Sequence, residues 1–177
     1  MDASLARRGF AEALGTGLLV LAVVGSGIAA ERLSPGQTGL QLLENAAATA
    51  AALVAIILAV GAVSGAHLNP VVTLAARAFG SLSTREAAVY AGAQVLGGAA
   101  GAVVANLMFS LPAVELSTQV RSSGALWFSE VVATLGLLLV IFGVVRSGRV
   151  TAAPFAVGTY IGARTSSRPQ RASPIRR

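Results

Sequence analysis

Four long stretches of apolar and small residues dominate the pattern of hydrophobic and polar positions along the chain. They cover residues 9–30, 45–63, 87–109 and 124–145. Because a helix needs about 20 apolar residues to cross the hydrocarbon core of a bilayer, each stretch predicts one transmembrane helix. A fifth apolar stretch, residues 150–163, reaches only about two thirds of a crossing at about 1.5 Å per residue. It predicts an incomplete span.

The segment between the second and third stretches does not fit a simple crossing. Ser64 and Gly65 interrupt the second helix, and the pair Asn69-Pro70 then precedes a short apolar run. Asn is a favoured N-cap, and Pro suits the first helical position, so residues 70–78 predict a short helix that begins inside the membrane. Irregular backbone at that depth is tolerated only where it is buried in protein or lines a cavity. The segment therefore predicts a re-entrant loop and a half-helix beside a pore.

Composition supports a membrane protein and gives its orientation. The 177 residues are 55% apolar and 11% charged, and the chain has no cysteine and a single histidine. All 13 basic residues are arginines, which indicates the codon usage of a high-GC bacterium. Short cytoplasmic loops retain positive charge, and this predicts a cytoplasmic N-terminus in the plasma membrane. The arginines of the predicted cytoplasmic side are Arg7, Arg8, Arg77, Arg85, Arg146 and Arg149, against Arg32 and Arg121 outside. We expect the bilayer, and no nucleic acid, as the partner of this surface.

A weak internal repeat relates the first and fourth predicted spans. The sequence Phe-Ala-Glu that ends at Glu12 is echoed by Phe-Ser-Glu ending at Glu130, an offset of 118 residues. Because two predicted spans lie between them, the first and fourth spans cross the membrane in opposite directions, and the two copies would lie upside down relative to each other, as in many channels and transporters. A carboxylate inside a span is expensive without a partner, so Glu12 and Glu130 are candidate structural residues.

These features together resemble a known family. The stretch Ser-Gly-Ala-His-Leu-Asn-Pro-Val-Val-Thr-Leu, residues 64–74, looks like the first signature loop of the aquaporin and glycerol facilitator (major intrinsic protein) family. The paired glutamates, Tyr90 with Ala93-Gln94, and Gly97-Gly98-Ala99 also match its pattern, and the resemblance covers residues 8–163. Val71 stands where the signature usually has Ala.

The resemblance implies an all-α membrane fold, a right-handed bundle of six helices with two half-helices meeting at the membrane centre. It also implies a homotetramer in which water or small neutral solutes pass through each subunit, with no enzymatic activity, cofactor or metal. Glu12 and Glu130 would brace the loops, and Thr49, counted back from the signature, would contribute to the outer filter. Glycerol and neutral metalloid acids remain open as permeants beside water. The expected pore-lining residues are Gly65, Ala66, His67, Asn69, Pro70 and Val71.

Two other readings use the same residues. An intramembrane serine hydrolase would pair Ser64 or Ser26 with His67, but Ser64 and His67 are too close in one loop for a nucleophile and its base, and no Gly-x-Ser-x-Gly elbow is present. A small membrane subunit without transport is the second alternative.

The four-residue spacing of Gly97 and Gly101 is typical of helix packing and needs no role in the pore.

Residues 164–177 differ in character from the rest of the chain. Five arginines, two prolines and polar residues make this tail unsuited to a membrane helix, and we expect it to be disordered. The chain contains no second Asn-Pro pair. A shifted reading frame of the tail permits a peptide ending in Asn-Pro-Ala, so we hypothesise a frameshift after Ala163 that truncates a complete channel and impairs it. Resequencing that finds no such frame would contradict this hypothesis.

Overall fold

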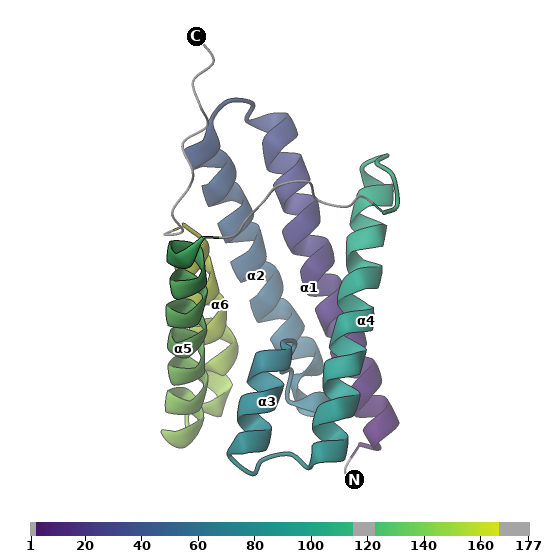
Figure 1. Ribbon diagram of the computed structural model, residues 1–177, viewed down its shortest axis with the longest axis vertical. Coiled ribbons are helices and arrows are strands. Elements are labelled where there is room, and N and C mark those ends of the chain that lie inside the picture. The colour runs from purple at the N-terminus through teal and green to yellow at the C-terminus, as the bar shows by residue number, and fades with distance from the viewer. Residues whose placement is uncertain (1–2, 115–122, 167–177) are drawn as a thin grey trace.

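The computed structural model describes residues 3–114 and 123–166, and this part of the chain is helical and without strands. Figure 1 shows the arrangement of the helices. They are α1 (Leu5–Leu33), α2 (Thr38–Ser64), α3 (Pro70–Ala78), α4 (Thr84–Met108), α5 (Gly124–Arg146), the short 3₁₀ helix η1 (Val150–Ala152) and α6 (Ala153–Ser166). Four of them, α1, α2, α4 and α5, are long and apolar enough to cross a membrane. The structure is the all-helical membrane bundle that the sequence predicts.

Several helices extend beyond the apolar stretches because capping residues set their ends. The Ser4 side chain accepts a hydrogen bond from the N–H of Arg7, so α1 begins before the apolar stretch. At the start of α4, Ser83 and Glu86 form a capping box in which each side chain bonds the other's backbone N–H. Hydropathy locates the part of a helix that lies in lipid, whereas the caps decide where the helix itself begins.

Helix α1 packs against both α2 and α4, and the three lie side by side (Figure 1). Two glycines of α4 allow the closest approach. A Cβ atom on Gly97 would lie 2.0 Å from the carbonyl oxygen of Ala13, and one on Gly101 would lie 2.1 Å from that of Gly17. The four-residue spacing therefore serves backbone contact between α1 and α4, as the sequence indicates.

Helix α3 lies at the end of the bundle that carries the N-terminus, beside α4 (Figure 1). It also contacts α5, where the rings of Phe79 and Phe142 meet edge to face with 4.8 Å between their centroids. The half-helix thus starts inside the bundle and leads back to the same end.

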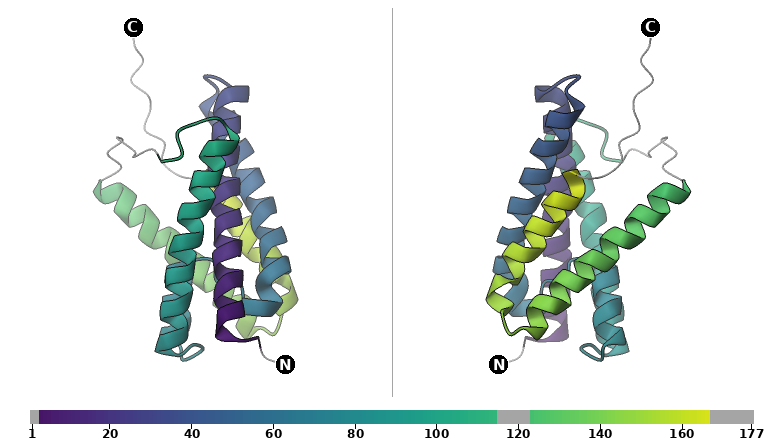
Figure 2. Two further views of the ribbon diagram at one scale, coloured as in Figure 1. Left: turned by 90° about the vertical axis from the view of Figure 1, so that its right-hand side faces the viewer. Right: turned by 90° about the vertical axis from the view of Figure 1, so that its left-hand side faces the viewer.

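Helices α5 and α6 form a hairpin through η1, and α6 fastens this hairpin to α2 (Figure 2). Gly158 permits the contact, since a Cβ there would lie 2.5 Å from Val54 Cγ2. Helix α5 tilts away from the bundle toward its N-terminal end, and only Ala133 and Leu137 are buried along it. The α5 helix is therefore the least packed of the four long helices.

The expected boundary of the tail falls inside α6. This helix continues past Ala163 to Ser166, and its residue Arg164 forms an ion pair with Glu130 on α5. At 14 residues α6 is still shorter than a membrane crossing. The remainder of the expected tail, residues 167–177, lies outside the described residues, as does Arg121.

Candidate functional site

A cavity of about 620 Å³ lies where α1, α2, the re-entrant loop, α5 and α6 meet. Aliphatic side chains form most of its wall, including Leu53, Val72 and Leu137. Its polar side chains are few, and they are Thr49, His67, Asn69, Ser81 and Thr151. An apolar cavity with a small number of placed polar groups is the usual composition of a ligand site.

The backbone of the re-entrant loop has an unusual conformation. Gly65 ends α2 in the left-handed region with φ +87°, and Ala66 and Leu68 also have positive φ, +49° and +51°. Non-glycine residues adopt this region at a cost of about 1–3 kcal/mol each and persist there only when surrounding contacts hold them. Gly65, Ala66 and His67, which the sequence analysis expects in a pore wall, border the cavity.

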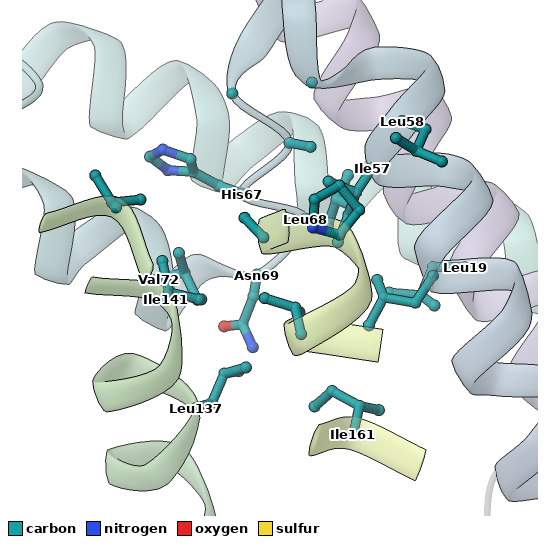
Figure 3. A pocket seen from close by; sticks show the side chains of 18 of the residues that line it. Leu19, Ile57, Leu58, His67, Leu68, Asn69, Val72, Leu137, Ile141 and Ile161 are labelled. Atoms are coloured by element: carbon teal, nitrogen blue, oxygen red, sulfur yellow. The ribbon is translucent and has the colours of Figure 1, made fainter. Parts of the chain in front are cut away.

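Asn69 links this loop to the half-helix. Its side-chain Oδ1 accepts a hydrogen bond from the N–H of Val71 at 2.8 Å, which caps α3. Among the described residues, its Nδ2 has no partner, and the side chain reaches into the cavity between Leu137 and Ile161 (Figure 3). The N-terminus of a helix carries partial positive charge. Asn69 therefore presents a free amide donor at the positive end of α3.

Pro70 and Val71 lie beside the cavity and not on its wall. Pro70 occupies the first position of α3, and Val71 is 44% exposed, whereas Val72 is buried and borders the cavity. Successive residues of a helix point about 100° apart, so the cavity-facing positions are Asn69 and Val72. In the described part of the chain, the Val71 departure from the signature does not alter the cavity wall.

Glu12 is fully buried in α1 and holds the loop through both of its carboxylate oxygens. Oε1 accepts from the Ser64 hydroxyl at 2.6 Å and from the His67 N–H at 2.9 Å. Oε2 accepts from the Leu68 N–H at 2.7 Å and from the Gln94 amide at 2.8 Å. A carboxylate has about four acceptor sites, so these donors use its full capacity. The geometry matches the bracing role expected of this residue.

A second group of polar side chains supports the half-helix. Gln94 Nε2 lies 2.9 Å from the hydroxyl of Thr73, which is fully buried, and that hydroxyl lies 3.2 Å from Nδ1 of His67. The His67 ring also meets the ring of Tyr90 edge to face at 5.4 Å. His67 is thus held by structural contacts on the α3 and α4 side.

The contacts do not support a hydrolase. Ser64 donates its hydroxyl hydrogen to Glu12, and Ser26 donates to the Ala22 carbonyl within its own helix at 2.6 Å. Within the described residues, neither serine is hydrogen-bonded to His67. A nucleophile needs such contact with its base.

Thr49 faces the cavity from α2 and is 5% exposed. Its hydroxyl has no hydrogen-bond partner in the described part of the chain. Buried hydroxyl groups are normally paired, and this oxygen is itself buried, so Thr49 is an unsatisfied polar residue beside the cavity.

Glu130 occupies a different environment from its repeat counterpart. Its side chain is 50% exposed and forms an ion pair with Arg164. The loop that it was expected to brace lies outside the described residues. The two glutamates of the repeat therefore have distinct contacts here.

Sequence reasoning assigned no role to several buried polar residues. Tyr90, Gln94 and Thr73 are each at most 1% exposed. The available signal was polarity within an apolar segment, since such residues need partners in a membrane. Their partners lie on other helices, so they can be identified only once the packing of α1, α3 and α4 is known.

Comparison with known proteins places the sequence beside channels of one family. The sequence profile of the family described as "Major intrinsic protein" matches residues 1–168. Aquaglyceroporin AqpS of Rhizobium meliloti is 48% identical over 159 residues, covering 90% of this chain and 67% of AqpS. Aquaporin Z of Rhodopseudomonas palustris is 35% identical over 84% of this chain and 67% of its own length. The sheep lens fiber major intrinsic protein is 35% identical over 89% of this chain and 61% of its length.

The fold agrees with this relationship. The X-ray structure of the aquaglyceroporin from Plasmodium falciparum superimposes with a TM-score of 0.77 at 27% identity, covering 93% of this chain and 73% of that one. The chain thus spans roughly two thirds of the length of the curated relatives that it matches. It belongs to the major intrinsic protein family, a family of transmembrane channels for water and small solutes.

Proposed function

We propose that the cavity is part of a path for passive diffusion of water and small uncharged solutes, and that the chain catalyses no reaction. The free Nδ2 donor of Asn69 at the positive end of α3 is the observation that carries this proposal. A passing hydroxyl or water oxygen would accept from Asn69 while its own hydrogens face the loop residues Gly65 to His67. The helix dipole disfavours cations at the same point.

Thr49 supports a path that admits more than water. Its side chain is small and borders the cavity, so a solute larger than water has room beside it. The relative AqpS is described as an aquaglyceroporin. We therefore propose glycerol-like solutes and neutral metalloid acids as permeants beside water.

The proposed setting is the plasma membrane of a bacterium, with the N-terminus in the cytoplasm and a homotetramer as the full-length assembly. The end of the bundle that holds the N-terminus also holds the end of α3, the start of α4 and the end of α5 (Figure 1). Arg77, Arg85, Arg146 and Arg149 lie at or next to these helix ends, and Arg7 and Arg8 lie at the start of α1. Positive charge on short loops favours the cytoplasmic side.

Flux measurements on an extended protein test the proposal. Because the chain spans 67% of AqpS, we define the extended channel as residues 1–163 followed by the remaining third of AqpS. Asn69→Asp keeps an oxygen that caps α3 but removes the amide donor and adds a charge. In proteoliposomes, it should lower water and glycerol flux about fivefold or more, the factor for about one hydrogen bond.

Asn106→Asp is the matched control, since Asn106 lies near the end of α4, away from the cavity, and donates to the Ala113 carbonyl. Its flux should stay close to that of the parent. Equal losses in both variants would argue against a specific role of Asn69. An extended channel that folds but passes no more solute than empty liposomes would favour the alternative of a subunit without transport.

A further inference from the structure

The re-entrant loop keeps its unusual backbone conformation only if surrounding contacts hold it. Ala66 and Leu68 both hold positive φ angles, and the N–H groups of residues 66 to 68 bond to Ser64 Oγ or to Glu12. These bonds fix the amide side of the loop. The carbonyl of Ser64, at the end of α2, needs a donor from elsewhere, because the last carbonyls of a helix have no partner within it.

Tyr90 supplies this donor from α4. Its hydroxyl donates to the Ser64 carbonyl oxygen at 2.7 Å, and the residue is fully buried. The distance is that of a good O–H···O bond. The hydrogen bond connects α4 to Ser64, the last residue of α2 before the re-entrant loop.

Arg8 determines which way the Tyr90 hydroxyl points. Its Nε donates to the phenolic oxygen at 2.8 Å, and its guanidinium carbon lies 5.3 Å from the centre of the ring. Arginine has only donors, so the phenolic oxygen must accept from it. The hydroxyl hydrogen is then directed to the Ser64 carbonyl.

Glu86 holds Arg8 in place. It forms an ion pair with Arg8 Nη1, while its other oxygen accepts from the Ser83 N–H at 2.8 Å in the capping box of α4. The start of α4 is thereby connected to the re-entrant loop through the contacts of Glu86 with Arg8, of Arg8 with Tyr90, and of Tyr90 with the Ser64 carbonyl.

We propose that Tyr90 is a positioning residue for the re-entrant loop and that the Arg8–Glu86 ion pair orients the Tyr90 hydroxyl. The functional meaning of this arrangement rests on the proposed permeation path. The chain of contacts would fix where the loop residues Gly65 to His67 stand relative to a passing solute.

Hydrogen exchange of the 177-residue protein in lipid nanodiscs tests the proposal without a flux measurement. Tyr90→Phe removes the hydroxyl and keeps the ring, so exchange of the amides of residues 66–68 should accelerate about tenfold, the factor for one buried hydrogen bond. Tyr160→Phe is the matched control, because Tyr160 also donates to a helix carbonyl, that of Ala133 at 3.0 Å. It should leave the loop amides unchanged.

Arg8→Met should also accelerate loop exchange, but only while the Tyr90 hydroxyl is present. In the Y90F background it should add nothing further. Unchanged loop exchange in Tyr90→Phe, or equal acceleration across all helices, would overturn the proposal. If Tyr90→Phe does not fold, Arg8→Met decides by itself, and unchanged loop exchange there is equally decisive. Absence of flux through the extended channel, together with the predicted exchange pattern in the 177-residue protein, would count against the permeation path alone.

Discussion

At the scale of single residues, Glu12 connects α1 to the re-entrant loop by hydrogen bonds. Glu12→Gln replaces one acceptor oxygen by an NH₂ group that faces N–H or O–H donors. We expect the free energy of unfolding in detergent to fall by about 3 kcal/mol, since hydrogen bonds to charged groups contribute about 1.5–3 kcal/mol each. Glu31→Gln, an exposed position of the same helix, should change it by less than about 0.5 kcal/mol. Similar losses for both would contradict the bracing role.

Thr49 provides a test of selectivity at the same scale. In the extended channel, Thr49→Phe should reduce glycerol flux more than water flux, because an aromatic ring narrows the cavity wall and removes the unpaired hydroxyl. Stopped-flow light scattering on proteoliposomes measures both fluxes. An equal reduction of the two would reject Thr49 as a filter residue.

Local chemistry made some of these residues predictable and left others hidden. The cap formed by Asn69 and the helix start at Pro70 follow from neighbouring residues alone, and the structure has both. Tyr90 and Gln94 act on loop or helix residues far away in sequence, such as Ser64 and Glu12. Such pairs depend on how α1, α2 and α4 cross, which no local pattern determines.

At the scale of helices, the contact of α1 with α4 depends on glycine. Gly97→Ala should lower the free energy of unfolding by about 1–3 kcal/mol, the usual range for overpacking, because the new Cβ would lie 2.0 Å from the Ala13 carbonyl oxygen. Gly92→Ala is the matched control in the same helix, where a Cβ meets nothing within 4 Å. It should be neutral or stabilising by up to about 1 kcal/mol. Denaturation in mixed micelles measures both, and equal effects would contradict the close approach.

Helix type and order followed from hydropathy, but helix ends did not. The apolar stretches located all four long helices, whereas the capping box at Ser83 and the Ser4 cap moved their starts. Near the end of α6, Arg164 forms an ion pair with Glu130, and these residues lie 34 positions apart. A composition-based boundary at Ala163 could not include that interaction.

At the scale of the whole molecule, the absence of cysteine allows a direct test of orientation. Single cysteines can be placed at Gln37, exposed in the turn between α1 and α2, and at Ser147, exposed after α5. The loop arginines predict a cytoplasmic N-terminus, so an impermeant maleimide should label Gln37→Cys in intact spheroplasts. Ser147→Cys should react only after permeabilisation, and the reverse pattern would invert the proposed topology.

The last prediction concerns conduction by the 177-residue chain itself. The described residues contribute one half-helix, α3, with its single Asn donor and one positive dipole end at the cavity. Helix α5 buries only Ala133 and Leu137, so one side of the cavity depends on a weakly packed helix. Polar backbone of the loop that reaches lipid would be left without hydrogen bonds. We expect solute flux near that of empty liposomes.

The extended channel should conduct under the same conditions, because the family resemblance implies a second half-helix opposite α3. Equal amounts of folded protein, checked by size-exclusion chromatography, make the two fluxes comparable. Robust and selective flux from the 177-residue protein would contradict the prediction and would require a pore built from more than one copy. Cross-linking between single cysteines on α5 would then detect that pairing, because α5 has the most exposed apolar face to offer a second copy.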